Sequence, residues 1–211
     1  MKTIGVPNEW IDLIDSMVPD ILELIVASWV LMPTIVPDTR EDPITEELCR
    51  LLRANRSSGD LPFRIDIQMV ELDPTPGETQ GRLDIAFSPM VPREDIYFCL
   101  ECKRLSVPDG TTTRSFATEY VTHGMMRFIR GKYGKRVKHG GMLGYVFDGN
   151  VTSAFAAIAA AIRARLSDLG MDAPGEMKKS SIRPHDSNCR ETYHKRGELG
   201  PFIIHHQVVP V

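Results

Sequence analysis

Three strand-like segments follow one another in the first half of the chain, and they constrain its fold more than any other feature. Phe63–Leu72 alternates apolar and polar side chains, which is the pattern of a strand with one buried face. After a turn at Pro74–Gly77, two further apolar segments follow, Gly81–Phe87 (GRLDIAF) and Ile96–Leu105 (IYFCLECKRL). This pattern predicts three consecutive strands joined by short connections.

Helical periodicity precedes these strands. One helix is expected near Asn8–Met17 and another near Pro19–Met32. A third is expected to have Asp42 as its N-cap residue, since Pro43 suits the first helical position. Its buried face is expected to be the apolar stripe of Ile44, Leu48, Leu51 and Leu52.

The residues after the three strands alternate between helical and strand patterns. A loop is expected at Pro108–Thr113, then a helix at Ser115–Arg130, a buried strand at Gly141–Phe147 and an alanine-rich helix at Thr152–Leu169. A late strand is expected at Pro201–Val209. The order helix, three strands, helix, strand, helix predicts an α/β fold, with a mixed central sheet flanked by helices.

Length and composition indicate one globular domain. The chain has 211 residues, of which 42% are hydrophobic and 25% charged, close to ordinary globular usage. Within a single domain over residues 1–211, we expect a helical extension over 1–40, a core over 42–170, and C-terminal strands or loop over 180–211. Disordered and fibrous classes are excluded by the same figures.

The sequence predicts a cytoplasmic protein without a membrane anchor. No apolar run opens the chain, so a secretory signal is not expected. The most hydrophobic stretch, Ile21–Val36, is interrupted by Glu23 and Pro33 and is too short to span a bilayer. Four cysteines in a chain of this length do not make a disulfide framework.

The charge is unevenly distributed along the chain. The net charge of −3 argues against a uniformly basic surface for nucleic acid. Residues 103–138, however, contain nine Lys or Arg against only Asp109 and Glu119. Such a local basic surface is what phosphate binding requires.

Three charged residues stand inside the predicted strands. Glu101 and Lys103 point to the same face, because strand side chains alternate. Asp84 stands alone between Leu83 and Ile85 in the preceding strand. Charged groups in apolar strands are costly to bury without a purpose. If these two strands pair, Asp84 and Glu101 converge on one face.

This convergence suits the hydrolysis of a phosphodiester bond. Two carboxylates can hold Mg²⁺, for which Mn²⁺ can substitute, and the metal lowers the pKa of a bound water. Lys103 can orient that water or help to deprotonate it, and can offset developing negative charge. The competing interpretation is a Glu101–Lys103 ion pair on a solvated sheet edge. Cys99 and Cys102 have a CxxC spacing, but they fall on opposite strand faces and are expected to be buried thiols.

The arrangement of Asp84, sixteen intervening residues, and Glu101-Cys102-Lys103 resembles the motif of the PD-(D/E)XK, or restriction-endonuclease-like, nucleases. The predicted order of elements resembles the αβββαβ core of that superfamily, over roughly residues 42–147. The resemblance implies that Asp84 and Glu101 are metal ligands and that Lys103 is the catalytic lysine. Leu83 stands where the name of the motif has proline, a position that varies widely in the superfamily.

Other residues are weaker candidates for this site. The resemblance implies a further acid from the helix before the first strand, and Glu47 is the best match for this third metal ligand. In the helix after the motif, spacing places Tyr120, His123 and Arg127 on one face, where they could contact phosphate. The remaining candidates for nucleic-acid binding are Arg114, Arg130 and Lys132.

These residues favour a metal-dependent endonuclease that acts on DNA rather than RNA, in defence, repair or mobile-element biology. A catalytically silent nuclease-fold protein, acting as a binding or assembly module, is one alternative. An unrelated α/β protein, such as a small regulatory or immunity factor, is another. The large apolar side chains within Ile21–Val36, including Trp29, predict a homodimer or partner interface.

Overall fold

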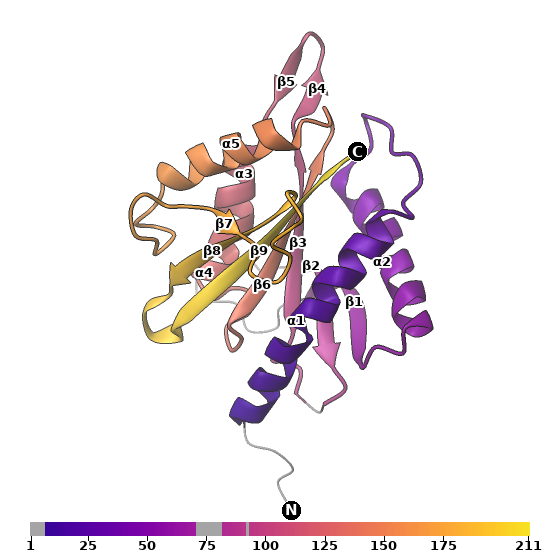
Figure 1. Cartoon of the computed structure of the whole chain (residues 1–211), viewed down its shortest axis with the longest axis vertical. Helices are drawn as coiled ribbons and strands as arrows, with labels where there is room; N and C mark the ends of the chain where they lie inside the picture. The colour runs from indigo at the N-terminus through magenta and orange to yellow at the C-terminus, as the bar shows by residue number, and fades with distance from the viewer. Residues whose placement is uncertain (1–6, 71–81, 92) are drawn as a thin grey trace, which may run out of the picture.

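A mixed sheet of seven strands forms the centre of the computed structural model, which describes residues 7–70, 82–91 and 93–211 (Figure 1). The order across the sheet is β1-β2-β3-β6-β9-β8-β7. Here β3, β6 and β9 run parallel, and the other neighbours are antiparallel. The strands are β1 (Phe63–Val70), β2 (Arg82–Pro89), β3 (Phe98–Leu105), β6 (His139–Val146), β7 (Lys178–Lys179), β8 (Cys189–Lys195) and β9 (Pro201–Pro210).

Helices cover both faces of this sheet (Figure 1). One face carries α1 (Pro7–Trp29) and α2 (Glu41–Ser58). The other carries α5 (Val151–Arg163) and a continuous segment of α3 (Ala117–Glu119), η1 (Tyr120–Met125) and α4 (Met126–Ile129). The predicted α/β class and the mixed sheet flanked by helices are confirmed. Helical structure before the first strand is also confirmed, as α1 and α2. The turn expected at Pro74–Gly77 lies outside the described residues.

The N-terminal region forms one helix where the sequence predicted two. Pro19 lies inside α1, although proline removes a backbone donor and strains a helix interior. The residues Ile14, Val18, Ile21 and Ile25 recur at helical spacing and are almost completely buried in the main core. This burial holds the helix together through the proline and packs α1 into the main core.

Much of the predicted N-terminal interface is occupied by the chain itself. Trp29 stacks on Tyr145, with 5.3 Å between ring centroids. Apolar side chains remain exposed just beyond α1: Val30 is 77% exposed, Leu31 56% and Val36 61%. A homodimer or partner contact through these three residues stays a prediction. No helix in the described ranges is long and apolar enough to cross a membrane.

The first turn of α2 differs from the prediction. The helix begins at Glu41 with Arg40 as the N-cap residue, so Asp42 is not the cap. Glu41 instead points its carboxylate at β3, which anchors the start of the helix. The predicted apolar stripe is buried at Ile44, Leu48 and Leu52.

The helical segment after β3 contains a π-helix, η1, which changes the predicted faces. Its i→i+5 hydrogen bonds add one residue to a turn, so residues beyond it rotate relative to an α-helix. Tyr120 is fully buried, and its hydroxyl lies 2.9 Å from Nδ1 of His206, so it is not available to bind nucleic acid. His123 is exposed and Arg127 half-buried. Tyr120 therefore faces β9, whereas Arg127 reaches Glu101 on β3.

A glycine lets this segment approach the sheet closely. A Cβ at Gly124 would lie 2.4 Å from Cε of Met142 and 3.7 Å from Cγ of Glu101. A larger residue would require the end of the Met142 side chain to move, so glycine permits the close approach of η1 to the strands. The helix therefore covers Glu101 directly.

The connections and the C-terminal region depart from the prediction in detail. The loop expected at Pro108–Thr113 is a short hairpin of β4 (Val107–Asp109) and β5 (Thr112–Arg114), which projects from the molecule (Figure 1). The late strand is confirmed as β9, which pairs with β6, while β8 and the one-turn helix η2 (Gly197–Leu199) were not predicted. All four cysteines are free, as expected, and the predicted burial of Cys99 and Cys102 is confirmed.

Candidate active site

Two carboxylates hold the part of β3 that lies beyond its hydrogen-bonded pairing with β2. The pairing between these strands covers Phe98 to Leu100 of β3. Beyond it, the backbone N–H of Cys102 donates to Oδ2 of Asp84 at 2.7 Å, and that of Arg104 donates to Oε2 of Glu41 at 3.1 Å. Side chains thus replace the missing strand partner, which fixes both acids beside β3.

Lys103 lies among the oxygen atoms of this cluster. Its Nζ is 2.9 Å from Oε1 of Glu101, 3.0 Å from Oε1 of Glu41 and 3.9 Å from Oδ2 of Asp84. It also donates to the carbonyl oxygen of Cys102 at 2.6 Å. An ammonium group therefore occupies a position with four oxygen atoms around it.

Glu101 is the most deeply buried member of the cluster. Its side chain is 0% exposed, and its Oε2 has no hydrogen-bond partner. Nη1 of Arg127 donates to Oε1 of Glu101 at 2.6 Å and to the hydroxyl of Tyr133 at 3.0 Å. Tyr133 in turn donates to the carbonyl of Arg82 at 2.6 Å. A buried carboxylate with an unsatisfied oxygen is costly, which indicates a site with a purpose beyond stability.

Burial and neighbouring charges shift the pKa values of these groups in different directions. Burial raises the pKa of Glu101 to about 7, against the opposing effects of Lys103 and Arg127. Burial likewise raises the pKa of Asp84. Burial disfavours the charged form of Lys103, but the three carboxylates outweigh it and raise its pKa. Lys103 is therefore a stable cation, while Glu101 can exchange a proton near neutral pH.

The oxygen donors fit a hard divalent cation. In the described part of the chain, no three His, Cys, Asp or Glu side chains are arranged as ligands of one metal ion. Asp84, Glu101 and the Cys102 carbonyl nevertheless offer oxygens close together, and Oε2 of Glu101 lacks a partner. Mg²⁺ characteristically takes one or two carboxylates and completes its coordination with water and substrate. The donor set suits this ion better than zinc.

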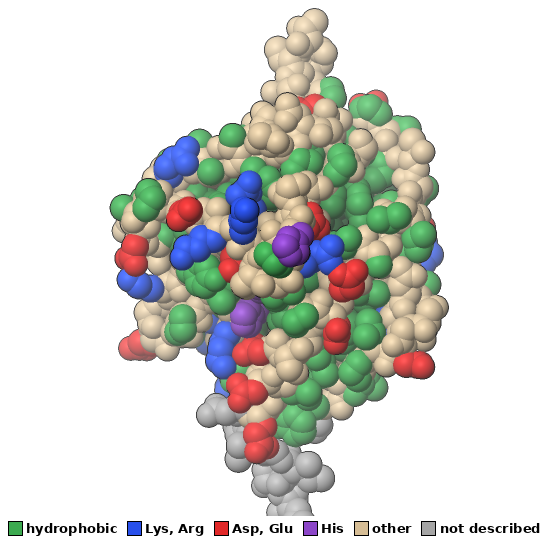
Figure 2. Space-filling model, in the orientation of Figure 1, with side chains coloured by type: hydrophobic (Ala, Val, Ile, Leu, Met, Phe, Trp, Pro, Cys, Tyr) green, Lys and Arg blue, Asp and Glu red, His purple; other side chains and the backbone are tan. Residues whose placement is uncertain are grey.

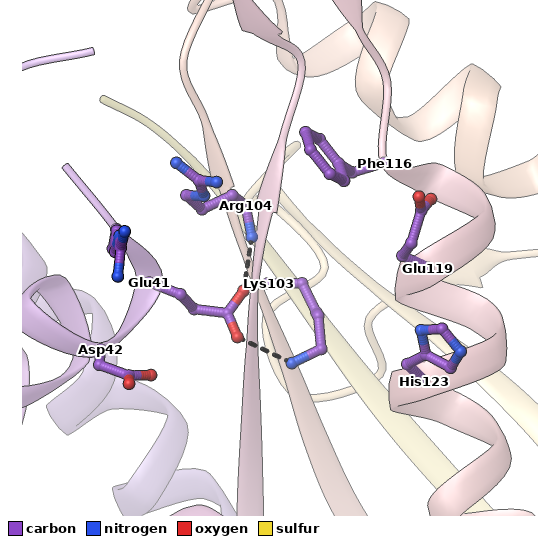
Figure 3. Close-up of a pocket in the computed structure, with 8 residues that line it drawn as sticks. Glu41, Asp42, Lys103, Arg104, Phe116, Glu119 and His123 are labelled. Atoms are coloured by element: carbon purple, nitrogen blue, oxygen red, sulfur yellow. Dashed lines mark hydrogen bonds and ion pairs between the residues drawn. The ribbon is translucent and has the colours of Figure 1, made fainter. Parts of the chain in front are cut away.

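A pocket of about 410 Å³ opens beside Lys103. It lies between the start of α2, strand β3 and the helix after the hairpin (Figure 3). Glu41 and Lys103 point toward one another, and Phe116, Glu119 and His123 line the opposite side (Figure 3). A substrate could therefore reach the Lys103 ammonium from solvent.

The structure brings together the main predicted residues and separates others from them. Asp84, Glu101 and Lys103 converge, and Arg127 joins them through Glu101. Glu47 does not point to Lys103: it forms an ion pair with Arg50, and Glu41 takes the place expected for it. The two acids are six positions apart along α2, which turns Glu47 well away from Glu41 around the helix.

The remaining basic candidates lie at different distances from the pocket. Arg114 stands near its rim, where Nη2 lies 3.3 Å from Oε1 of the pocket residue Glu119. Arg130 is exposed at the end of α4, and Lys132 follows it in the turn. Basic and acidic side chains are interspersed on the face shown in Figure 2, rather than gathered into one basic area. Phosphate binding would therefore depend on individual cations near the pocket.

Two residues of the site were not predicted from the sequence: Glu41, which contacts Lys103, and Tyr133, which contacts Arg127. Glu41 was overlooked because Asp42 was assigned as the helix cap, although an acid in a first helical turn was visible. Tyr133 lies in a turn without a recognisable pattern.

Comparisons of the chain with protein-family models, curated proteins and solved structures find no match.

Proposed function

We propose that this protein is a metal-dependent nuclease that hydrolyses phosphodiester bonds of DNA. The observation that carries the proposal is the convergence of Asp84, Glu101 and Lys103 beside an open pocket, with an unpartnered oxygen on buried Glu101. The order α2-β1-β2-β3-helix-β6, with β2 antiparallel to both neighbours, supports a restriction-endonuclease-like fold.

The residues divide the chemistry between them. Asp84, Glu101 and the Cys102 carbonyl would hold Mg²⁺, which lowers the pKa of a bound water and offsets charge on the phosphate. Lys103 stays protonated beside the carboxylates, so it donates hydrogen bonds to the attacking water or to a phosphate oxygen. Glu41 positions Lys103, and Arg127 compensates the charge of Glu101.

Metal dependence tests this proposal. We expect Mg²⁺ or Mn²⁺ to support cleavage of supercoiled plasmid DNA, whereas Ca²⁺, which tolerates loose geometry, should not support it. Gel electrophoresis of nicked and linear products measures the outcome, with Glu101→Gln protein purified in parallel as a control for contaminating nucleases. Cleavage that persists in excess EDTA would rule out the metal assignment.

Substitutions of two acids of α2, Glu41 and Glu47, should differ in their effect on cleavage. Glu41→Gln keeps only one acceptor oxygen, so it can no longer accept from both Lys103 and Arg104, and it removes the charge that holds the ammonium. Loss of such a supporting contact typically costs about 10- to 100-fold in activity. Glu47→Gln is the matched control and should stay within about twofold, because Glu47 pairs with exposed Arg50. The initial cleavage rates of both variants measure these effects. Equal rates would show that Glu41 does not support the function of Lys103.

A catalytically silent nucleic-acid-binding module is the second candidate function. It is favoured by one observation: Glu101 is already paired with Lys103 and Arg127, and no third acidic ligand joins it within the described ranges. Such a module would bind DNA with equal affinity in EDTA and in Mn²⁺, and it would leave the plasmid intact.

A further inference from the structure

Phe116 lines the pocket in a backbone conformation that a bulky side chain rarely adopts. Its φ of 55° lies in the left-handed region, which for a residue of this size signals strain. The hydrogen bonds on either side hold it there: Ser106 N–H donates to the Ser115 carbonyl at 3.1 Å, and Tyr120 N–H donates to the Phe116 carbonyl at 2.9 Å. Strain of this kind persists mainly at active sites and ligand clamps.

Two guanidinium groups lie against the Phe116 ring. The Cζ of Arg114 is 4.3 Å from the ring centroid, and that of Arg104 is 5.8 Å away. Arg104 also lines the pocket, next in sequence to Lys103 (Figure 3). The ring is half-buried, so the rest of its surface is open to a ligand. Aromatic rings combined with arginine form the usual platforms for unpaired nucleobases.

We propose that Phe116, with Arg104 and Arg114, forms a nucleobase-binding subsite for an unpaired base of the polynucleotide. This inference rests on the proposed function, because it assigns the base next to the phosphate at Lys103. A base inside a duplex is already stacked on both sides, so the subsite takes single-stranded or locally opened nucleic acid. The subsite therefore favours single-stranded over double-stranded nucleic acid. It does not select among base sequences, since every base has a π-face.

A binding assay with a matched abasic oligomer tests the subsite. The probes are a short single-stranded DNA and an abasic oligomer with the same number of phosphates, both dye-labelled and titrated in Ca²⁺, which should not support cleavage. We expect the wild type to bind the base-containing DNA about 5- to 150-fold more tightly. In Phe116→Asn this ratio should fall to about one, because stacking is lost while phosphate contacts remain.

Variants at Phe116 separate stacking from a structural role. Asparagine tolerates the left-handed conformation, so Phe116→Asn should fold. Phe116→Tyr and Phe116→Leu both keep bulk and backbone strain, but only tyrosine keeps a ring, and only tyrosine should keep the ratio. Phe147→Leu is the matched control, since Arg104 lies 5.9 Å from that ring. A ratio unchanged in both Phe116→Asn and Phe116→Leu would overturn the subsite.

The subsite and the nuclease activity fail in distinguishable ways. If the protein prefers base-containing DNA in a way that depends on Phe116 but does not cut DNA with Mg²⁺ or Mn²⁺, the proposed nuclease activity is refuted and the subsite is supported. Metal-dependent cleavage by a wild type with no preference for bases over the abasic oligomer refutes the subsite and retains the nuclease.

Discussion

Asp84→Asn, Glu101→Gln and Lys103→Met should each reduce metal-dependent DNA cleavage by at least ~10³-fold. Each substitution is close to isosteric, so it removes charge and leaves the shape of the cluster almost unchanged. The two acid variants lose a carboxylate donor for Mg²⁺. Lys103→Met loses the cation that lies 2.9 Å from Glu101 and faces the pocket. Single-turnover rates at saturating Mn²⁺ measure the three effects.

An acid outside the site provides the control for these variants. Asp66 is a half-buried strand residue of the same sheet, and it pairs with Arg64 at 2.6 Å. Asp66→Asn should retain wild-type activity. Cleavage by Glu101→Gln at the wild-type rate would contradict the assignment, and so would a complete loss of folding in all three site variants.

Lys103→Met should also destabilise the metal-free protein by about 3–5 kcal/mol at pH 8. Its ammonium lies among the carboxylates of Glu41, Asp84 and Glu101, and in the variant only Arg127, at Glu101, would remain to offset their charge. Mn²⁺ should restore part of the loss, and it should therefore raise the melting temperature of the variant more than that of the wild type. Urea unfolding with and without Mn²⁺ measures these differences.

The stability deficit should shrink as the pH falls. The pKa of Glu101 is raised to about 7 from an ordinary 4.5, and removing Lys103, which lowers it, raises it further. Above about pH 7 the folded variant therefore still holds a proton on Glu101 that the folded wild type has released, so the stability of the variant relative to the wild type rises as the pH falls toward about 7. A deficit that stays constant from pH 8 to 5 would contradict this account.

The wild type and a surface-lysine variant serve as controls for the stability measurements on Lys103→Met. Burial lowers the pKa of His194 and His205 to about 4, so both proteins lose stability as the pH falls below about 6.5, and only their difference reports on the carboxylates. Lys138 pairs with Asp12 and Asp15 at the surface, each at 3.3 Å. Lys138→Met should cost less than about 1 kcal/mol.

The core of the candidate site follows from local sequence rules, and its surroundings do not. Alternation along a strand fixes Glu101 and Lys103 on one face whatever packs around them, so this part was predictable. The contact of Glu41 with Lys103 depends on how α2 docks against β3, which no local pattern encodes. The prediction for Glu47 rested on a family resemblance, which does not specify how α2 is rotated about its axis. In the structure this rotation directs Glu41 toward Lys103 and leaves Glu47 paired with Arg50.

Long-range packing also overrode local signals in the fold. Pro19 predicted a break, but the buried stripe of α1 outweighs it. Strand β9 inserts beside β6 from about sixty residues further along the chain, a parallel pairing that periodicity alone does not specify. The seven-stranded sheet was therefore predicted only at its β1-β2-β3-β6 side.

The π-helical turn makes the contact between Arg127 and Glu101 depend on the length of the chain. A π-helical turn holds one more residue than an α-helical turn, so an unbroken α-helix of the same sequence would place Arg127 about 100° further around the helix axis. Glu101 would then lose a cation although no contacting residue had been replaced. Deleting one residue from η1 as the turn closes would return Arg127 to its present direction, so the contact requires either the π turn or a chain that is one residue shorter.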